Sequence, residues 1–499
     1  MSETLTLDRP GEPHTRRPLV VDLDGTLLKG DLLFECLFTS ISASPARALQ
    51  ALFAGRASRS RLKVTLERAA RLEVSSLPYR EEVLALIRRR RRAGDRIVLC
   101  TAAAQALAER IAAHLGLFDE VFGSDETLNL KGANKARFLA ERFGIRGFDY
   151  VGDSAADLPV WDVAGAALVT AASERTISAL GARGGEISHI AARDNRARAA
   201  IRAMRPHQWS KNVLIFLPLL AAHAVSMDVI LPTLAIFVAF CCVASGIYLV
   251  NDLLDLAADR AHPRKRARPL ASGHLPLVHA SGLAAVLILA GTAIALVLGP
   301  GAVLVTLGYL ALTTGYSLFL KRKIVLDVCV LAGLYTVRIL AGIVVTGLPT
   351  SVWLLGFSVF FFFGLAAVKR LAEIAVKAGG SPGALTGRAY EAMDAGIVSS
   401  MAIASNYAAI LIFALYLNSE VVTQIYRTPA ALWLVCPVLL YWTSRTVIIA
   451  HRGLMEDDPV IFAFRDKVSR ACFALIGVIL LAASLADFGS LLRTIYSIS

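Results

Sequence analysis

The hydrophobic pattern divides the chain into two halves. Residues 1–200 contain no apolar run long enough to cross a bilayer, whereas residues 212–492 consist mostly of such runs. A membrane span needs about 20 apolar residues. The pattern therefore predicts a C-terminal all-α membrane domain of nine transmembrane helices, near 212–227, 229–250, 277–297, 300–319, 324–347, 352–368, 397–417, 430–450 and 472–491.

The first half instead shows short apolar strands that end in polar residues. The first strand begins at Leu19 and runs into the acidic loop that holds Asp22 and Asp24. The second covers 96–100 and ends at Thr101, and the third covers 148–151 and precedes Asp153. Helical patterns separate the strands, which predicts a Rossmann-like α/β domain with polar groups at the carboxyl edge of a parallel sheet, where such sheets bind ligands.

Charge and composition fix the expected topology. Lys and Arg gather before the first span and in the loops after spans 2, 4, 6 and 8, so these segments and the N-terminus are expected on the cytoplasmic side of a cell membrane. The net charge of +13 then reflects topology and phosphate handling, since the chain has no nucleic-acid-binding motif. The seven Cys include no CxxC, and most lie in the expected spans, where they are expected to be small apolar fillers.

An acidic row follows the second span. Asn251, Asp252, Asp255 and Asp259 lie in one short segment, and in a continuous helix the three Asp fall within about 60° of one another. Like charges so placed repel, so a divalent cation with hard-oxygen preference, Mg²⁺ holding a substrate phosphate, explains them best. The alternative is a solvated helix end. The basic run that follows supplies phosphate-binding cations, of which Lys265 and Arg268 are candidates.

The polar groups of the first half suit phosphoryl transfer. In such a site one carboxylate attacks phosphorus, another moves the proton and others hold Mg²⁺. A hydroxyl and a lysine would neutralise the remaining phosphate oxygens. Thr101 and Lys135 fit these roles, with Lys131 as a competitor for the second.

The order DxDGT, strand-terminal Thr, Lys and GDxxxD resembles the haloacid dehalogenase superfamily. The resemblance covers about residues 18–180 and implies a helical cap at about 30–92 that sets substrate choice. It also implies a nucleophile, Asp22, an acid/base, Asp24, and a Mg²⁺ site. The implied metal ligands are Asp22, Asp24 and Asp153, with Asp157 in support.

The NDxxDxxxD row and the nine spans resemble the UbiA superfamily of intramembrane prenyltransferases. Members carry a second DxxxD motif after the fourth span, but here Asp327 is followed by Leu331 at the partner position. This departure disfavours a prenyl diphosphate held between two acidic motifs. It favours a more cationic site with a single metal motif, so that each half of the chain is expected to bind Mg²⁺ at one site.

Several local strings resemble the decaprenyl-phosphate phosphoribosyltransferase branch of that superfamily, including RPHQWSKN at 205–212 and the HPxKxxRP tail at 262–269. The resemblance implies transfer of 5-phosphoribose from phosphoribosyl diphosphate to a polyprenyl phosphate, which gives a lipid-linked phosphoribose for cell-wall arabinan. Asp252, Asp255 and Asp327 are the implied catalytic residues. Candidate substrate-binding residues in the membrane half are Lys211, Asn212, Lys321, Arg338, Lys369, Arg388 and Tyr390.

The sequence thus predicts a bifunctional membrane enzyme, with a phosphatase able to remove the 5-phosphate of the transfer product. The expected parts are a disordered lead (1–17), a haloacid dehalogenase-like domain (18–180), a connector (181–204) and a UbiA-type domain (205–495). Two alternatives stay open: a prenyltransferase acting on an aromatic or other small acceptor, and a membrane-anchored phosphatase whose spans only bind lipid.

Overall fold

The structure is a computed structural model of the chain. It describes residues 17–56, 59–70, 72–125, 129–183, 187–191, 194–224, 226–348, 352–378, 390–419, 422, 425–455 and 458–485. The expected disordered lead, apart from Arg17, lies outside these residues.

The chain forms two compact units. The first comprises residues 1–204 and 248–284, and the second comprises residues 205–247 and 285–499. The segment that carries the acidic row therefore belongs to the same unit as the N-terminal half. The sequence had placed the row within a separate membrane domain that begins at residue 205.

The N-terminal half of the first unit contains a six-stranded parallel sheet of order β3-β2-β1-β4-β5-β6. This confirms the predicted α/β class and adds three strands to those seen in the sequence. Strand β1 pairs with both β2 and β4, so the polar residues that follow these three strands meet at one edge. The strands are β1 (Leu19–Val21), β2 (Ile97–Ala104), β3 (Glu120–Ser124), β4 (Asp149–Gly152), β5 (Ala166–Thr170) and β6 (Ile187–Ala191).

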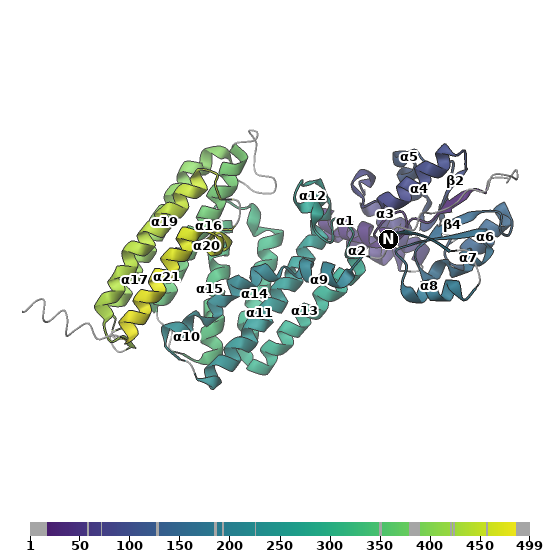
Figure 1. The fold of residues 1–499 in the computed structure, drawn as a ribbon. Coiled ribbons are helices and arrows are strands. Elements are labelled where there is room, and N and C mark those ends of the chain that lie inside the picture. The colour runs from purple at the N-terminus through teal and green to yellow at the C-terminus, as the bar shows by residue number, and fades with distance from the viewer. Residues whose placement is uncertain are drawn as a thin grey trace, which may run out of the picture. The chain divides into compact units, whose positions relative to one another are not determined.

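Alternate residues of the central strands enter two separate cores. Leu19 and Val21 pack with α4, α5 and the helices that follow β1, whereas Val20 packs with α6, α7 and α8. The helices on the two faces of the sheet can be followed in Figure 1. They are α4 (Glu81–Arg92), α5 (Gln105–Leu115), α6 (Ala133–Phe143), α7 (Leu158–Val163) and α8 (Glu174–Gly181). After β6 the chain continues into α9 (Arg196–Met204).

Three helices, α1 (Leu32–Ala43), α2 (Pro45–Gly55) and α3 (Arg59–Ala70), occupy the region expected to form the cap. Side-chain caps define the first two. Asp31 accepts from the Leu33 N–H at the start of α1, and Ser44 caps α2 just before Pro45. These helices share the hydrophobic core that contains Leu19 and Val21.

Eight helices of the described residues are long and apolar enough to cross a membrane, which confirms the multi-pass membrane class. The first expected span, near 212–227, instead forms a 3-10 segment, η3 (Pro206–Phe216), and a short helix, α10 (Leu217–Ala221), with Pro206 and Pro218 near their starts. The spans lie in α11 (Met227–Leu254), α13 (Leu277–Leu298), α14 (Pro300–Leu318), α15 (Leu326–Thr346), α16 (Val352–Ala378), α17 (Ala395–Leu417), α19 (Val435–His451) and α21 (Lys467–Leu485).

Candidate functional site

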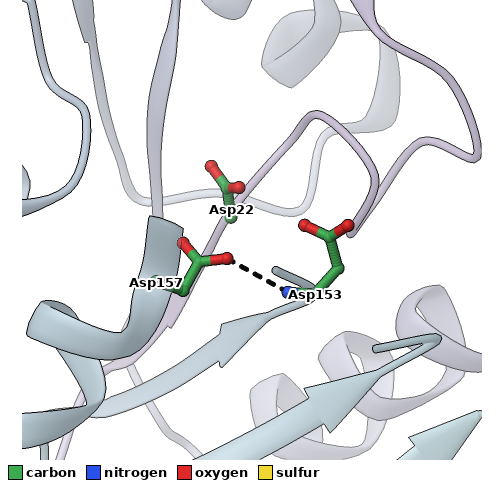
Figure 2. Close-up of side chains that lie close together, drawn as sticks. All are labelled: Asp22, Asp153 and Asp157. Atoms are coloured by element: carbon green, nitrogen blue, oxygen red, sulfur yellow. Dashed lines mark hydrogen bonds between the residues drawn. The ribbon is translucent and has the colours of Figure 1, made fainter. Parts of the chain in front are cut away.

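Three carboxylates converge at the carboxyl edge of the sheet. Asp22 follows β1, Asp153 follows β4 and Asp157 precedes α7, and an oxygen of each lies within 4.8 Å of the others. Figure 2 shows them gathered around one point. The Asp153 carboxylate lies close to the backbone of the loop after β1. This contact requires glycine at position 25, because Gly25 has φ of +79° and a Cβ there would lie 2.3 Å from an Asp153 oxygen.

A buried hydrogen-bond network fixes this group. Lys135 Nζ donates to Asp22 at 2.6 Å and to the Tyr150 hydroxyl at 3.0 Å, and that hydroxyl donates to Asp157 at 2.8 Å. Asp157 also accepts from the Asp153 and Ser154 backbone N–H groups. Lys135 is therefore the lysine that reaches Asp22, whereas its competitor Lys131 is exposed. Tyr150 was not anticipated, because it reads in sequence as an ordinary apolar strand residue.

Asp24 has a separate environment. Its carboxylate accepts from the Leu32 N–H at 2.8 Å, at the start of α1. Burial, reinforced by the nearby Asp31, raises the pKa of Asp24 to about 7, a value suited to a group that gives and takes a proton near neutrality. Thr101 is fully buried within β2, which continues to Ala104 with a register shift after Cys100, and its hydroxyl accepts from the Ala103 N–H.

The carboxylate group suits a divalent cation. Burial raises the pKa of Asp153 well above its ordinary value, and Asp157 and Asp22 add to the rise by repulsion. Burial also raises the pKa of Asp22, and Lys135 opposes that rise. Oxygen ligands that are buried together and repel one another are the set that Mg²⁺ accepts. The carboxylates of Asp22, Asp153 and Asp157 supply that set, and the expected part of Asp24 in metal binding stays a prediction.

The acidic row does not form one continuous helix. Helix α11 ends at Leu254, and Asp255 is the N-cap of α12 (Leu256–Ala261). Backbone hydrogen bonds from Asp255 to Asn251 and from Asp259 to Asp255 nevertheless keep the helical spacing across the break. Asp252 and Asp259 therefore still reach one common partner, Arg268, whereas the common face expected for all three acids stays a prediction.

One cation lies where two of these acids converge. Arg268 Nη1 donates to Asp252 at 3.2 Å and to Asp259 at 2.6 Å, and both acids are almost fully buried. Lys265 lies 3.9 Å from Asp259 and is about half exposed. Two carboxylates that reach a single nitrogen define a point at which a positive charge is held, and this arrangement fits a metal ion.

In the second unit Asp327 lies at the start of α15. Its carboxylate is fully buried and forms hydrogen bonds with two other side chains. Arg370 Nε donates to it at 2.5 Å and the Tyr390 hydroxyl at 2.8 Å. Tyr390 also accepts from the Val325 N–H. Asp327 and Tyr390 thus belong to an internal network around Arg370, which sequence reasoning did not single out.

Arg338 lies three turns further along α15 and has neutral partners. Its guanidinium donates to Asn212 at 2.7 Å, to the Tyr309 hydroxyl at 3.1 Å and to the Leu334 carbonyl. Within the described part of the chain it forms no salt bridge, although it is 5% exposed. A buried arginine whose charge no carboxylate offsets is a candidate anion ligand.

Asp458 joins two of the predicted lysines. Lys211 and Lys369 donate to the same Asp458 oxygen at 2.9 and 2.8 Å, and the Tyr335 hydroxyl reaches the other oxygen at 3.3 Å. Burial alone would raise the pKa of Asp458, but the two lysines hold it well below the usual range. The sequence offered one signal for Asp458, an Asp-Pro pair at a helix start, where Asp458 caps α20 (Pro459–Arg465).

The guanidinium of Arg338 and the ammonium of Lys211 both lie over the Tyr335 ring, 5.8 and 5.7 Å from its centre. We call the set of three cations and one acid the lysine cluster; it consists of Lys211, Arg338, Lys369 and Asp458. Of the remaining candidates, Lys321 lies in a 3-10 turn before α15, and Arg388 falls outside the described residues.

Two family models match the chain. The UbiA prenyltransferase family matches residues 213–455, and the haloacid dehalogenase-like hydrolase family matches residues 19–162. The chain belongs to the UbiA family and carries a haloacid dehalogenase-like domain at its N-terminus, which confirms the predicted fusion.

The chain is also similar to individual proteins. The chain is 40% identical over 462 residues to an uncharacterised protein, y4nM, of Sinorhizobium fredii, across 92% of this chain and 89% of that one. It is 38% identical over 185 residues to the decaprenyl-phosphate phosphoribosyltransferase of Mycolicibacterium smegmatis, across 36% of this chain and 58% of that protein. A solved UbiA homologue from Archaeoglobus fulgidus, bound to GPP and Mg²⁺, is 16% identical with a TM-score of 0.43, across 56% of this chain and 99% of that one.

Proposed function

We propose that this UbiA-type membrane protein transfers 5-phosphoribose from phosphoribosyl diphosphate to a polyprenyl phosphate, and that its fused phosphatase domain removes the 5-phosphate from the product. The similarity to a decaprenyl-phosphate phosphoribosyltransferase supports the first reaction. The carboxylate group beside Asp24 supports the second.

The observation that carries the proposal is the presence of two distinct charged groups, the acidic row with Arg268 and the lysine cluster. A reaction between a diphosphate donor and a phosphate acceptor must bind two phosphorylated substrates. The acidic row with Arg268 suits a diphosphate held through a metal, and the lysine cluster suits a second anion without a metal. A prenyltransferase whose acceptor carries no phosphate would need only one phosphate-binding group.

The charge of the lysine cluster suits the proposed acceptor. Lys211, Lys369 and Arg338 carry three positive charges and Asp458 carries one negative charge, which leaves an excess of two. A phosphate monoester such as polyprenyl phosphate approaches a charge of −2 near pH 7. The acceptor would therefore neutralise the cluster, and buried charges are stable only when they are paired.

The residues of the acidic row would hold Mg²⁺ through Asp252, Asp255 and Asp259. The metal would supply charge neutralisation for the departing diphosphate, and Arg268 would add a second cation beside it. The acceptor phosphate is already anionic, so its oxygen can attack the anomeric carbon without a strong base. This agrees with the absence of a His–carboxylate pair in the motifs of the membrane half.

The state of Asp327 favours phosphoribosyl diphosphate over a prenyl diphosphate. The family position for a second acidic motif holds one acid, and Arg370 and Tyr390 bind that acid. Asp327 and Arg370 are both 0% exposed, whereas the Arg268 that meets Asp252 and Asp259 is 30% exposed, so Asp327 is the less accessible metal ligand. Asp327 then acts by ordering Arg370 and Tyr390 and not by holding a second metal.

In the phosphatase step Asp22 would attack phosphorus, and Asp24 would protonate the leaving ribose oxygen as the ester bond breaks. Asp24 would next take a proton from the water that hydrolyses the phospho-aspartate. Asp22, Asp153 and Asp157 would hold Mg²⁺, which would supply positive charge for the phosphate oxygens, and Lys135 and Thr101 would bind the remaining oxygens. We place the N-terminal domain and the acidic row on the cytoplasmic side of the cell membrane, because basic residues follow the row.

The test uses the purified full-length protein with phosphoribosyl diphosphate, polyprenyl phosphate and Mg²⁺, with lipid products followed by mass. We expect polyprenyl-phosphoribose. A parallel reaction contains labelled geranylgeranyl diphosphate and an aromatic acid. A prenylated acid with no phosphoribosylated lipid would replace the proposal by the prenyltransferase alternative, and no lipid product in either reaction would favour a phosphatase with a lipid-binding scaffold.

A further inference from the structure

A buried ion pair joins the segment of the acidic row to the N-terminal half, within one compact unit. Arg260 donates from Nη1 and Nη2 to the two oxygens of Glu35, at 2.9 and 2.7 Å. The two side chains are only 6% and 3% exposed. A two-pronged Arg–carboxylate contact fixes orientation as well as distance, so this pair sets how α1 lies against α12.

The Glu35 end of the pair leads to the proposed acid/base. Glu35 lies in the first turn of α1, whose first residue, Leu32, donates its N–H to Asp24. A shift of α1 would therefore move the donor that orients the Asp24 carboxylate. Asp24 has no other hydrogen-bond donor among the described residues.

The Arg260 end of the pair leads to the acidic row. Arg260 follows Asp259 directly, and its Nε donates to the Ala271 carbonyl at 3.1 Å. A second contact lies nearby, because Gly273 has φ of +74° and a Cβ there would lie 2.6 Å from Lys29 Cβ. Lys29 belongs to the loop between Asp24 and α1. The segment thus touches both the loop and the helix that frame Asp24.

We propose that Arg260 is a positioning residue of the phosphatase site: its ion pair with Glu35 holds α1 so that the Leu32 N–H orients Asp24. This deepens the proposed function, because a residue of the transferase motif then helps to set the geometry of phosphate removal. The inference rests on the phosphatase part of the proposed function.

The test exploits the leaving group. Loss of a well-placed general acid slows the cleavage of an alkyl phosphate, whose leaving oxygen must be protonated, far more than that of 4-nitrophenyl phosphate. In the full-length protein, Arg260→Ala is expected to lower kcat/KM for ribose 5-phosphate by about tenfold to a hundredfold. The value for 4-nitrophenyl phosphate should change by less than about twofold, since its anion leaves unaided.

Three further variants separate positioning from folding. Glu35→Gln should give the same selective loss, and Glu35→Gln combined with Arg260→Ala should be no worse than either alone, because both remove one contact. The exchanged pair Glu35→Arg with Arg260→Glu should recover much of the activity. Arg142→Ala, which removes a different Arg–Glu contact, with Glu120, is the control and should leave both esters unaffected.

Equal losses for the two esters in Arg260→Ala, or no loss, would overturn the inference, because the first outcome means general damage and the second means no coupling. Wild-type protein that cleaves neither ester would instead contradict the proposed phosphatase itself. The two failures are distinct, since the first requires an active wild-type enzyme.

Discussion

The carboxylate site of the N-terminal half and the lysine cluster of the second unit have opposite charge compositions. The first contains three acids, Asp22, Asp153 and Asp157, and one lysine, Lys135, which binds Asp22. The second contains one acid, Asp458, which binds Lys211 and Lys369, and a third cation, Arg338, beside Tyr335. Both groups are largely buried.

This difference in charge indicates the sign of the charge on the ligand that would suit each group. Buried charges are costly unless they are paired, so an excess of one sign in a buried group points to a ligand of the other sign. The acid-rich site suits a cation, and burial raises the pKa values of Asp22 and Asp153. The cation-rich cluster suits a phosphate. The net charge of the acidic row is intermediate between those of the two groups, because Arg268 neutralises part of its negative charge.

The largest effect is expected at the acid-rich site. Asp22→Asn keeps an oxygen for Lys135 but removes the nucleophile, so phosphatase activity should fall by about 10⁴-fold or more. Lipid products analysed by mass should then carry the 5-phosphate, whereas the wild-type protein should yield polyprenyl-phosphoribose. Identical, fully phosphorylated lipid from both proteins would show that the two reactions do not act in sequence.

The acidic row should give the next largest effect. Asp252→Asn and Asp255→Asn remove metal-binding charge and should lower lipid transfer by about 10²–10³-fold. Cleavage of 4-nitrophenyl phosphate should persist in both variants, because Asp22 and Asp24 are intact. Near-normal transfer in both would remove the metal role of the row.

A smaller loss is expected in the lysine cluster. Lys369→Gln removes one positive charge, so the KM for polyprenyl phosphate should rise by about tenfold to a hundredfold. This range corresponds to the free energy that a hydrogen bond to a charged group contributes. The KM for phosphoribosyl diphosphate should stay within about threefold. Arg445→Gln, which breaks the ion pair with Asp466 elsewhere in the second unit, is the matched control. A rise in the donor KM alone would assign the cluster to the donor.

The smallest effect concerns pH. Burial lowers the pKa of Lys211 to about 8, and Asp458 opposes the decrease. Lys211 therefore carries its charge below pH 8 and loses it above, so acceptor affinity should decline by a few fold between about pH 7.5 and 9. Arginine stays protonated in this range, so Lys211→Arg should lessen the decline. Superimposable pH profiles of the two proteins would exclude Lys211 as the group that titrates.

Local features were predictable from sequence alone. Strand β1 and the acidic loop that follows it were predictable because they are consecutive in the chain. The membrane helices were predictable because each depends on an apolar run within one segment. The meeting of Asp252 and Asp259 at Arg268 agrees with the helical spacing of the row, since that spacing is set within one segment. The break at Asp255 and the 3-10 start of the membrane half did not follow, because packing overrides the local pattern there.

Only the tertiary structure decided which charges meet. Asp458 lies 247 residues from Lys211, Arg370 lies 43 from Asp327, and Arg260 lies 225 from Glu35. Each pair depends on a close approach of distant segments, and no spacing along the chain encodes such an approach. The sequence by itself determined two domains, their classes and the candidate motifs. Packing determined that Asp327 is neutralised internally, that Arg338 has no acid partner in the described residues, and that the acidic row joins the unit of the phosphatase.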